Sequence, residues 1–348
     1  MLTERENTLR TIDRTGPEWI PTSVHILPAT WHKYRKELER LVVAHPFAYG
    51  AYEPGSMDFD HFQPRHRAGR FTDPWGCVWD NSEAGMMGVV VEHPLADWDA
   101  FDSFTPPDSL RYHEFGEWPA WEDFAKRLDA YRRRDQAVPV GVNRLFERLQ
   151  WLRGYENLMI DFMTGEPKVE ALIEMIVENN LRLIAKHAEF KPDVVLFMDD
   201  LGTQNQLMMS PALFKKHLVP AYARMFEAVK QCGARILMHS DGCILEAMPD
   251  LIECGLDAIN PQITPNTLEG IARVMKGKVA VELDLDRQQV LPFGTPRQVR
   301  AHIIKAVEHL ADPSGGLALV AECAPSVPLS NIEAILQTFD EVMDRVGG

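Results

Sequence analysis

Short apolar runs alternate with longer amphipathic stretches along most of this chain, and the alternation predicts its fold. The clearest run is Ile236-Leu237-Met238, which ends abruptly in His239, Ser240 and Asp241. A continuous apolar run bounded by polar and turn residues is typical of a strand buried on both faces of a parallel sheet. We therefore expect residues 235–242 to form an interior strand whose far end opens into a polar site.

Similar runs recur along the chain, and amphipathic segments separate them. The predicted strands are 23–27, 138–142, 194–198, 235–242, 258–260, 279–283 and 317–320. The predicted helices are 31–43, 120–134, 144–162, 167–189, 211–232, 244–254, 267–275, 296–310 and 330–346. This rhythm is typical of βα units around a parallel sheet. The number of units predicts an α/β fold of the TIM (β/α)8 barrel type, built as one domain over residues 1–348.

Residues 46–108 break this rhythm. Pro, Gly, His and Trp are frequent there, residues 86–91 are β-prone, and residues 71–79 have the pattern of a hairpin. We expect an insertion in the N-terminal part of the barrel, or a lid that covers its site. The first strand is not followed by a Gly-rich dinucleotide fingerprint, and the chain has no phosphate loop, which disfavours a nucleotide-binding fold.

The composition of the chain disfavours several classes of binding partner. The formal net charge is -15 and the chain has no basic stripe, which disfavours binding to nucleic acid or to an anionic membrane surface. The N-terminal residues lack the apolar segment of a signal peptide, and no apolar run approaches the ~18 residues of a membrane helix. The five cysteines have no disulfide-like spacing, so we expect a cytoplasmic protein. A homo-oligomer is compatible with the sequence, which does not fix the oligomeric state.

The predicted strands end in polar residues, and in a barrel these ends form the mouth where active sites lie. The residues at these ends are Asn143, Asp199, Asp200, His239, Asp241, Asn260, Gln262, Glu282, Asp284, Glu322 and Cys323. Their recurrence indicates one shared site.

Three of these residues are candidate metal ligands. His239 and Asp241 are two apart and face the same side of an extended strand, and Cys323 ends the last strand. Imidazole, carboxylate and thiolate all suit zinc. The alternative is that His239 and Asp241 bind a loop by hydrogen bonds while Cys323 is a small buried core residue.

Other strand-end residues are candidates for substrate contact. Asp199, Asp200 and Glu282 could act as acids, bases or orienting groups, although paired acids also cap helices or bind arginine. Arg144 and Arg148 lie one helical turn apart and could bind a substrate carboxylate, although such pairs are more often solvated. Asn143, Asn260 and Gln262 complete the candidate substrate-binding residues.

Several motifs resemble the uroporphyrinogen decarboxylase superfamily. They are Met209-Ser210-Pro211-Ala212-Leu213-Phe214, His239-Ser240-Asp241-Gly242, Gly255-Leu256-Asp257-Ala258-Ile259-Asn260-Pro261, Leu291-Pro292-Phe293-Gly294-Thr295-Pro296 and Cys323-Ala324-Pro325. The resemblance is best from about residue 137 onward and thin before residue 108.

The branch that this chain resembles more closely contains the cobalamin-dependent methyltransferases. The resemblance implies a methyltransferase that moves a methyl group between a small substrate, a methoxylated compound or a thiol, and a corrinoid that is free or carried by a partner protein. It also implies zinc, held through His-x-Cys and a later Cys at the positions of His239, Asp241 and Cys323. In that branch the position of Asp241 is usually Cys. A carboxylate is a harder ligand than a thiolate and gives less electron density to the metal, so zinc held here would be a stronger Lewis acid.

Two other functions remain open. The decarboxylases of the superfamily carry an N-terminal Met-Arg-Gln-Ala-Gly-Arg signature, whereas this chain has Val24-His25-Ile26-Leu27-Pro28-Ala29. A carboxy-lyase would therefore depend on Arg144 and Arg148. A barrel that binds a corrinoid or its carrier protein without catalysis is the third possibility.

Overall fold

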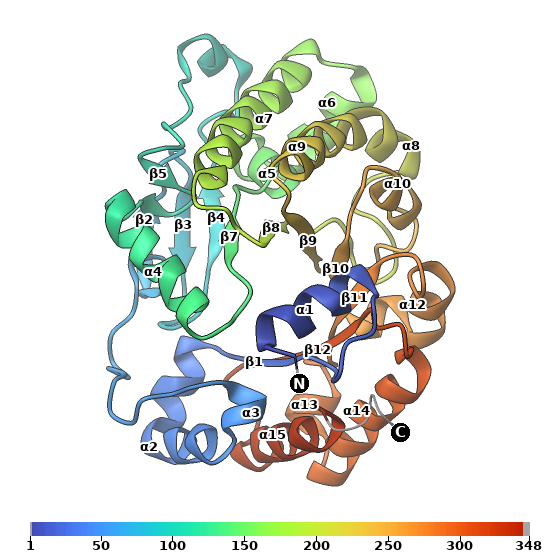
Figure 1. Ribbon diagram of the computed structural model, residues 1–348. Coiled ribbons are helices and arrows are strands. Elements are labelled where there is room, and N and C mark those ends of the chain that lie inside the picture. The colour runs from blue at the N-terminus through green and yellow to red at the C-terminus, as the bar shows by residue number, and fades with distance from the viewer. Residues whose placement is uncertain (1, 344–348) are drawn as a thin grey trace.

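The computed structural model describes residues 2–343 and contains a curled parallel sheet with helices around its outside (Figure 1). The sheet order is β1-β12-β11-β10-β9-β8-β7, and every neighbouring pair is parallel. Its strands are β1 (Thr22–Ile26), β7 (Pro139–Gly141), β8 (Val194–Met198), β9 (Arg235–Ser240), β10 (Ala258–Pro261), β11 (Ala280–Asp284) and β12 (Leu317–Cys323).

The predicted α/β barrel is confirmed, and each predicted interior strand has a counterpart in the sheet. Because β1 pairs with β12, the two ends of the chain meet in one curled sheet. Within the described residues the sheet has seven strands, and β1 and β7 form its two unpaired edges. The insertion follows the first βα unit, so the wall between these edges lacks a paired strand.

The helices follow the predicted pattern with local differences. They are α1 (Glu4–Asp13), α2 (Pro28–Ala44), α3 (Pro46–Tyr49), α4 (Trp121–Arg133), α5 (Phe146–Arg153), α6 (Tyr155–Thr164), α7 (Pro167–Ala188), α8 (Pro211–Leu213), α9 (Val219–Gln231), α10 (Met248–Glu253), α11 (Ile263–Asn266), α12 (Leu268–Val274), α13 (Val290–Phe293), α14 (Pro296–Leu310) and α15 (Leu329–Met343).

Two of the differences have a clear origin. The single helix predicted over 144–162 is two helices, because Gly154 has a φ of 81°, which residues with a side chain rarely adopt. The helix predicted over 330–346 is present as α15, and its predicted last residues, 344–346, lie outside the described residues. The start of α14 follows its sequence signal, since Thr295 and Gln298 form a capping box ahead of Pro296.

The insertion forms a separate antiparallel sheet beside the barrel (Figure 1). The hairpin predicted over 71–79 is confirmed as β2 (Gly69–Thr72) and β3 (Val78–Asn81), and β4 (Val89–Glu92) adds a third strand. Two short strands, β5 (Tyr112–His113) and β6 (Gly116–Glu117), follow. A role as a lid stays a prediction.

A fully buried ion pair joins this insertion to the barrel. A guanidinium nitrogen of Arg148 in α5 lies 2.7 Å from a carboxylate oxygen of Asp73, and both side chains have no exposed surface. Trp79 of β3 packs edge-to-face on Trp151 of α5, with ring centroids 4.8 Å apart. The insertion is therefore packed on α5 by charge and by aromatic contact.

Helix α1 lies across the amino-terminal ends of the strands. Arg5 binds Asp193, just before β8, and Asp13 binds Arg235 at the start of β9. The carboxyl ends of the strands therefore point away from α1 and form the opposite end of the barrel. Over residues 2–343, the helices are too short or too polar to cross a bilayer.

Candidate functional site

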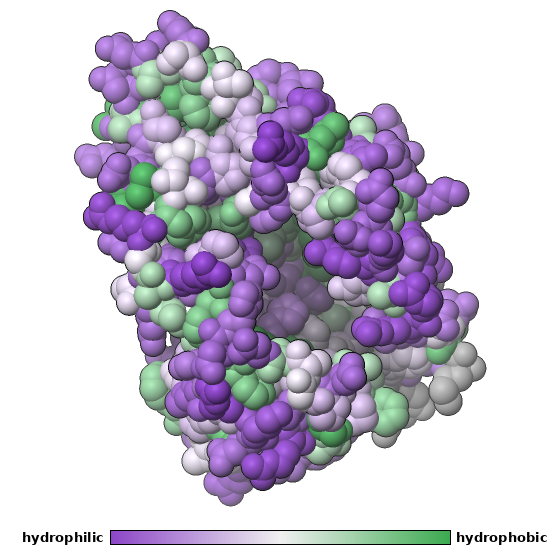
Figure 2. Space-filling view, turned by 90° about the vertical axis from the view of Figure 1, so that its left-hand side faces the viewer, coloured by the Kyte–Doolittle hydropathy of each residue, from purple (hydrophilic) through white to green (hydrophobic). Residues whose placement is uncertain are grey.

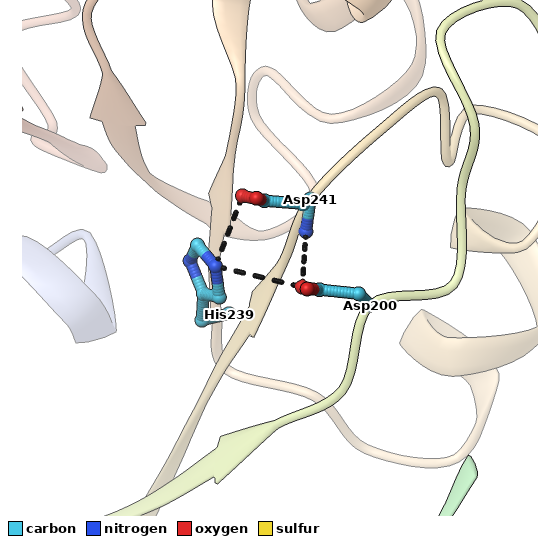
Figure 3. A group of neighbouring side chains, drawn as sticks. All are labelled: Asp200, His239 and Asp241. Atoms are coloured by element: carbon cyan, nitrogen blue, oxygen red, sulfur yellow. Dashed lines mark hydrogen bonds and ion pairs between the residues drawn. The ribbon is translucent and has the colours of Figure 1, made fainter. Parts of the chain in front are cut away.

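Two neighbouring strand ends bring three potential ligands together at the carboxyl end of the barrel. Asp200 follows β8, and His239 and Asp241 lie at the end of β9 and just after it. One ligand atom from each residue lies within 4.8 Å of the others (Figure 3). His239 Nε2 is 3.1 Å from Asp241 Oδ1 and 3.7 Å from Asp200 Oδ1. The backbone N–H of Asp241 donates to Asp200 Oδ1 at 2.9 Å, which fixes the two loops to each other.

Asn260 of β10 determines the protonation of His239. The amide Nδ2 of Asn260 lies 2.5 Å from the carbonyl oxygen of Glu282, which can only accept a hydrogen bond. The amide oxygen of Asn260 must then face His239 Nδ1, at 2.5 Å, and Nδ1 must carry a proton. His239 therefore presents its other nitrogen, Nε2, to the two aspartates.

Arg287, in the loop after β11, holds the far side of Asp241. One guanidinium nitrogen lies 2.5 Å from each oxygen of the Asp241 carboxylate. A second nitrogen donates to Glu322 at 2.8 Å, and Nε lies 3.4 Å from Asp284. One arginine thus links three carboxylates from three strand ends.

The electrostatics of the cluster follow from these contacts. Burial alone would lower the pKa of His239, but its hydrogen bond to Asp241 and the charges of Asp241 and Asp200 raise that pKa to about 9. Burial would raise the pKa of Asp241, but His239 and Arg287 hold it below its usual value. Burial and the nearby charge of Asp241 raise the pKa of Asp200. The site therefore favours a positive charge at Nε2 of His239.

The carboxylate of Asp199, the residue before Asp200, forms hydrogen bonds that hold the fold together. Its carboxylate accepts the backbone N–H groups of Leu145 and Glu147, both at 2.8 Å, and the hydroxyl of Tyr222 at 2.7 Å. A carboxylate at the first turn of α5 satisfies N–H groups that the helix leaves unpaired. Asp199 is thus engaged at α5 and lies outside the group formed by Asp200, His239 and Asp241.

Two of the three amide residues predicted to bind substrate, Asn143 and Gln262, form hydrogen bonds within the barrel wall. Asn143 donates through Nδ2 to Asn179 at 3.2 Å, and its backbone groups bind Asn180. Gln262 accepts the backbone N–H of Gly242 at 2.9 Å and so holds the loop that follows Asp241. Of the three predicted amides, Asn260 contacts the cluster directly.

The two arginines proposed to bind a substrate carboxylate are engaged with carboxylates of the protein. Arg144 binds Glu114, and its Nε lies 2.7 Å from Glu147. Arg148 is fully buried against Asp73. The helical spacing of Arg144 and Arg148 therefore does not form the expected clamp, because each has its own acidic partner.

Of the three residues expected to bind metal, the structure brings His239 and Asp241 together and leaves Cys323 apart from them. Among the described residues, the group of neighbouring ligand atoms consists of Asp200, His239 and Asp241. Cys323 is fully buried in the apolar core, and burial followed by the charge of Glu322 raises the pKa of its thiol to about 12. Because successive strand residues face opposite sides, Glu322 faces the barrel interior and Cys323 faces the surrounding helices.

Glu282 and Asp284 face the interior of the barrel on β11. Burial raises the pKa of each to about 7. Asp284 contacts Arg287, whereas the Glu282 carboxyl has no hydrogen bond or ion pair within the described residues. Arg287 itself was missed as a site residue by sequence reasoning. Its place in a loop directly after a barrel strand was the available signal, since such loops build the mouth.

These features define a TIM-barrel protein with an acidic, histidine-containing site at the carboxyl ends of its strands. The sequence model of the uroporphyrinogen decarboxylase (URO-D) family matches residues 88–342, and the chain belongs to that family. A search of curated protein sequences gave no significant match.

One solved structure supports the same fold. A methyltransferase from Methanosarcina mazei is 14% identical, with 98% of this chain and 99% of that chain covered and a TM-score of 0.65. A glycosylated endo-beta-1,4-xylanase from Gloeophyllum trabeum is 11% identical, with 66% of this chain and 81% of that chain covered and a TM-score of 0.41. At these identities the likeness to the methyltransferase is one of fold, and the likeness to the xylanase is weaker still.

Proposed function

We propose that this protein is a methyltransferase that moves a methyl group between a small substrate, a methoxylated compound or a thiol, and a corrinoid cofactor. In this proposal a zinc ion is held by Asp200, His239 and Asp241. The observation that carries it is the convergence of these three side chains at the mouth of a barrel of this family. Full-length similarity in fold to a methyltransferase is consistent with it.

The residues at the site fit a divalent cation. Asn260 keeps the proton of His239 on Nδ1, and this tautomer leaves the lone pair of Nε2 for a metal. Without a cation, Nε2 can bond to Asp241 only by gaining a second proton, which agrees with the raised pKa of His239. Two carboxylates and one imidazole form a harder ligand set than the thiolate-containing set that the resemblance implies.

When bound, zinc would supply Lewis acidity to the ether oxygen or thiol sulfur of the substrate. The residues of the chain would hold and orient the reacting groups. Asp200 and Asp241 fix the two loops of the site through their mutual hydrogen bond. Arg287 binds both oxygens of the Asp241 carboxylate, so its positive charge competes with a cation for that carboxylate. Asn260 holds the imidazole of His239 in one orientation.

The proposal is tested by metal content and by methyl transfer measured separately. Purified protein should retain about one zinc per chain and lose it in His239→Ala, while His309→Ala, on α14 and outside the ligand group, serves as the control. The zinc-loaded protein should methylate cob(I)alamin in the presence of a methoxylated compound, followed by the change in corrinoid absorbance. Wild-type protein that never retains zinc would remove the metal from the proposal.

The other two functions give different results in the same experiments. Decarboxylation would release carbon dioxide from uroporphyrinogen, and the engagement of Arg144 and Arg148 with Glu114, Glu147 and Asp73 disfavours it. A non-catalytic barrel would bind the corrinoid or its carrier protein and leave the absorbance unchanged with every methyl donor.

A further inference from the structure

The interior of the barrel contains a cavity of about 390 Å³ between α1 and the polar cluster. Its wall includes Leu237 and Ala258, which lie two residues before His239 and Asn260 on the same strands and therefore on the same face. This part of the cavity wall is thus one layer of side chains nearer the amino-terminal ends of the strands than the candidate site, whereas Glu282, which also lines the cavity, lies beside Asn260. No residue of the proposed metal site lines it.

The cavity exists because small side chains occupy interior positions that barrels usually fill. The interior of a TIM barrel is normally packed with layers of large branched residues. Here β10, β11 and β12 contribute Ala258, Ala280 and Ala318 to the cavity wall, while Leu196 and Leu237 make the opposite side apolar. The result is a largely apolar chamber in place of a packed core.

The chamber is open on the side where the sheet lacks a paired strand. A wider cavity of about 680 Å³, lined in part by β1, α3 and the residues after α4, shares Ser23, His25 and Glu282 with the chamber. Arg134 and Gln136 border it on the α4 side. Figure 2, which views the molecule from this side, shows a deep hollow. A ligand could therefore reach the chamber without passing through the mouth.

Several polar groups face this space without a protein partner, and three of them lie on the strands of the barrel. The side chains of Ser23, His25 and Glu282 line both cavities, and none of them makes a side-chain hydrogen bond or an ion pair within residues 2–343. By exposed surface His25 is exposed and Ser23 and Glu282 are half-buried, so all three are open to the hollow and available to a ligand. Although the ring of His25 is open to the hollow, desolvation by the surrounding groups lowers its pKa below the ordinary value, which favours a neutral imidazole that can accept a hydrogen bond.

The charged groups inside the barrel favour a ligand with a positive charge. The interior carboxyl groups are those of Asp200, Asp241, Glu282, Asp284 and Glu322, against the cationic groups of His239 and Arg287. Arg287 and His239 already have acidic partners, and Arg134 borders the wider cavity but does not line the chamber. The acidic side chains that line the chamber are those of Glu4 and Glu282, so an anionic ligand would meet negative charge there. An ammonium group brings three N–H donors, which match a carboxylate, a neutral imidazole and a hydroxyl.

We propose that this chamber is a second ligand site, which binds a small organic amine as its ammonium ion. Glu282 binds the charge, His25 and Ser23 accept the remaining N–H groups, and the apolar body of the amine packs against Leu196, Leu237 and Ala258. The proposal goes beyond methyl transfer and does not depend on it, because none of the three polar groups belongs to the proposed metal site.

Benzylamine and its neutral analogue benzyl alcohol are suitable probes, with affinity measured by calorimetry at pH 8 on the full chain. Wild-type protein should bind benzylamine at least about tenfold more tightly than benzyl alcohol, because only the ammonium ion pairs with Glu282. In Glu282→Gln this preference should disappear through weaker binding of benzylamine, while binding of benzyl alcohol is retained. A melting curve for each variant checks that it is folded.

A second variant tests the chamber itself. Ala318→Leu places a larger side chain in the space that both cavities share, so it should weaken the binding of both probes. Equal affinity of wild-type protein for the two probes, or an unchanged preference for benzylamine in Glu282→Gln, would overturn the proposal. Neither result would bear on zinc content, so the two proposals fail independently.

Discussion

His239 Nδ1 lies 2.5 Å from the amide oxygen of Asn260, and this contact fixes which nitrogen of the imidazole faces Asp200 and Asp241. The orientation of Asn260 depends in turn on a backbone carbonyl of the neighbouring strand. The chemistry of the candidate site is therefore set by the pairing of β9, β10 and β11.

Asn260→Ala should weaken zinc binding by about 10- to 100-fold, as is usual when the hydrogen-bond partner of a histidine ligand is removed. The imidazole would lose its fixed tautomer and orientation. Competition with a zinc chelator measures the dissociation constant, and Asn157→Ala, half-buried on α6 and outside the ligand group, is the matched control. An unchanged constant in Asn260→Ala would show that His239 does not bind the metal through Nε2.

Arg287→Gln should strengthen zinc binding by about tenfold, because the guanidinium competes with a cation for the Asp241 carboxylate. The same variant should melt at a lower temperature without zinc, since Asp241, Asp284 and Glu322 would lose their shared counter-charge. Arg297→Gln, on the exposed face of α14, should change neither quantity. Weaker zinc binding in Arg287→Gln would contradict the competition.

Cys323→Ala should leave zinc affinity within about twofold of wild type, whereas His239→Ala should reduce it by roughly a hundredfold or more. The thiol of Cys323 is buried in the apolar core and lies outside the ligand group. Chelator competition on both variants compares the two ligand sets directly. A large loss of zinc in a folded Cys323→Ala protein would restore the set expected from the sequence.

His187 should make the protein less stable in mild acid. Its ring is buried among Trp118, Trp121 and Phe124, neither ring nitrogen has a hydrogen-bond partner within residues 2–343, and burial lowers its pKa to about 4. Between pH 4 and about 6.5 the unfolded chain binds this proton more readily, so stability falls as pH falls through that window.

The loss from this one group should approach about 3 kcal/mol near pH 4. Urea unfolding at pH 7.5 and pH 4.5 measures it, and His187→Phe should reduce the difference between the two values by about that amount. His309, which is half-exposed on α14, provides the control, since His309→Phe should leave the difference as in wild type. A pH dependence that is the same in His187→Phe would exclude His187 as its source.

Asp73→Asn should destabilise the protein by about 3–5 kcal/mol, because it leaves the guanidinium of Arg148 buried without its counter-charge. Asp80→Asn in the same insertion should cost under about 1 kcal/mol, because its pairing with Arg70 is long and exposed. Chemical unfolding measures both. Similar values for the two variants would mean that the buried pair does not hold the insertion on the barrel.

The sequence by itself determined the elements and their class. The apolar runs predicted the interior strands in their correct places. Because parallel strands end on the same side of a sheet, the sequence also predicted that Asp200, His239, Asp241 and Asn260 lie at one end of the sheet. These features depend on local periodicity and on the common direction of parallel strands, both of which can be read along the chain.

The tertiary structure decided which of those residues act together. Cys323 and Glu322 are adjacent in sequence, yet they face opposite sides of β12, so the thiol is in the core and the carboxylate binds Arg287. Tyr222, Glu114 and Asp73, which bind Asp199, Arg144 and Arg148, lie in other segments of the chain, and Arg287 and Asp241 also come from two different segments. Such pairings depend on the closure of the barrel and the docking of the insertion, which leave no periodic signal in the sequence.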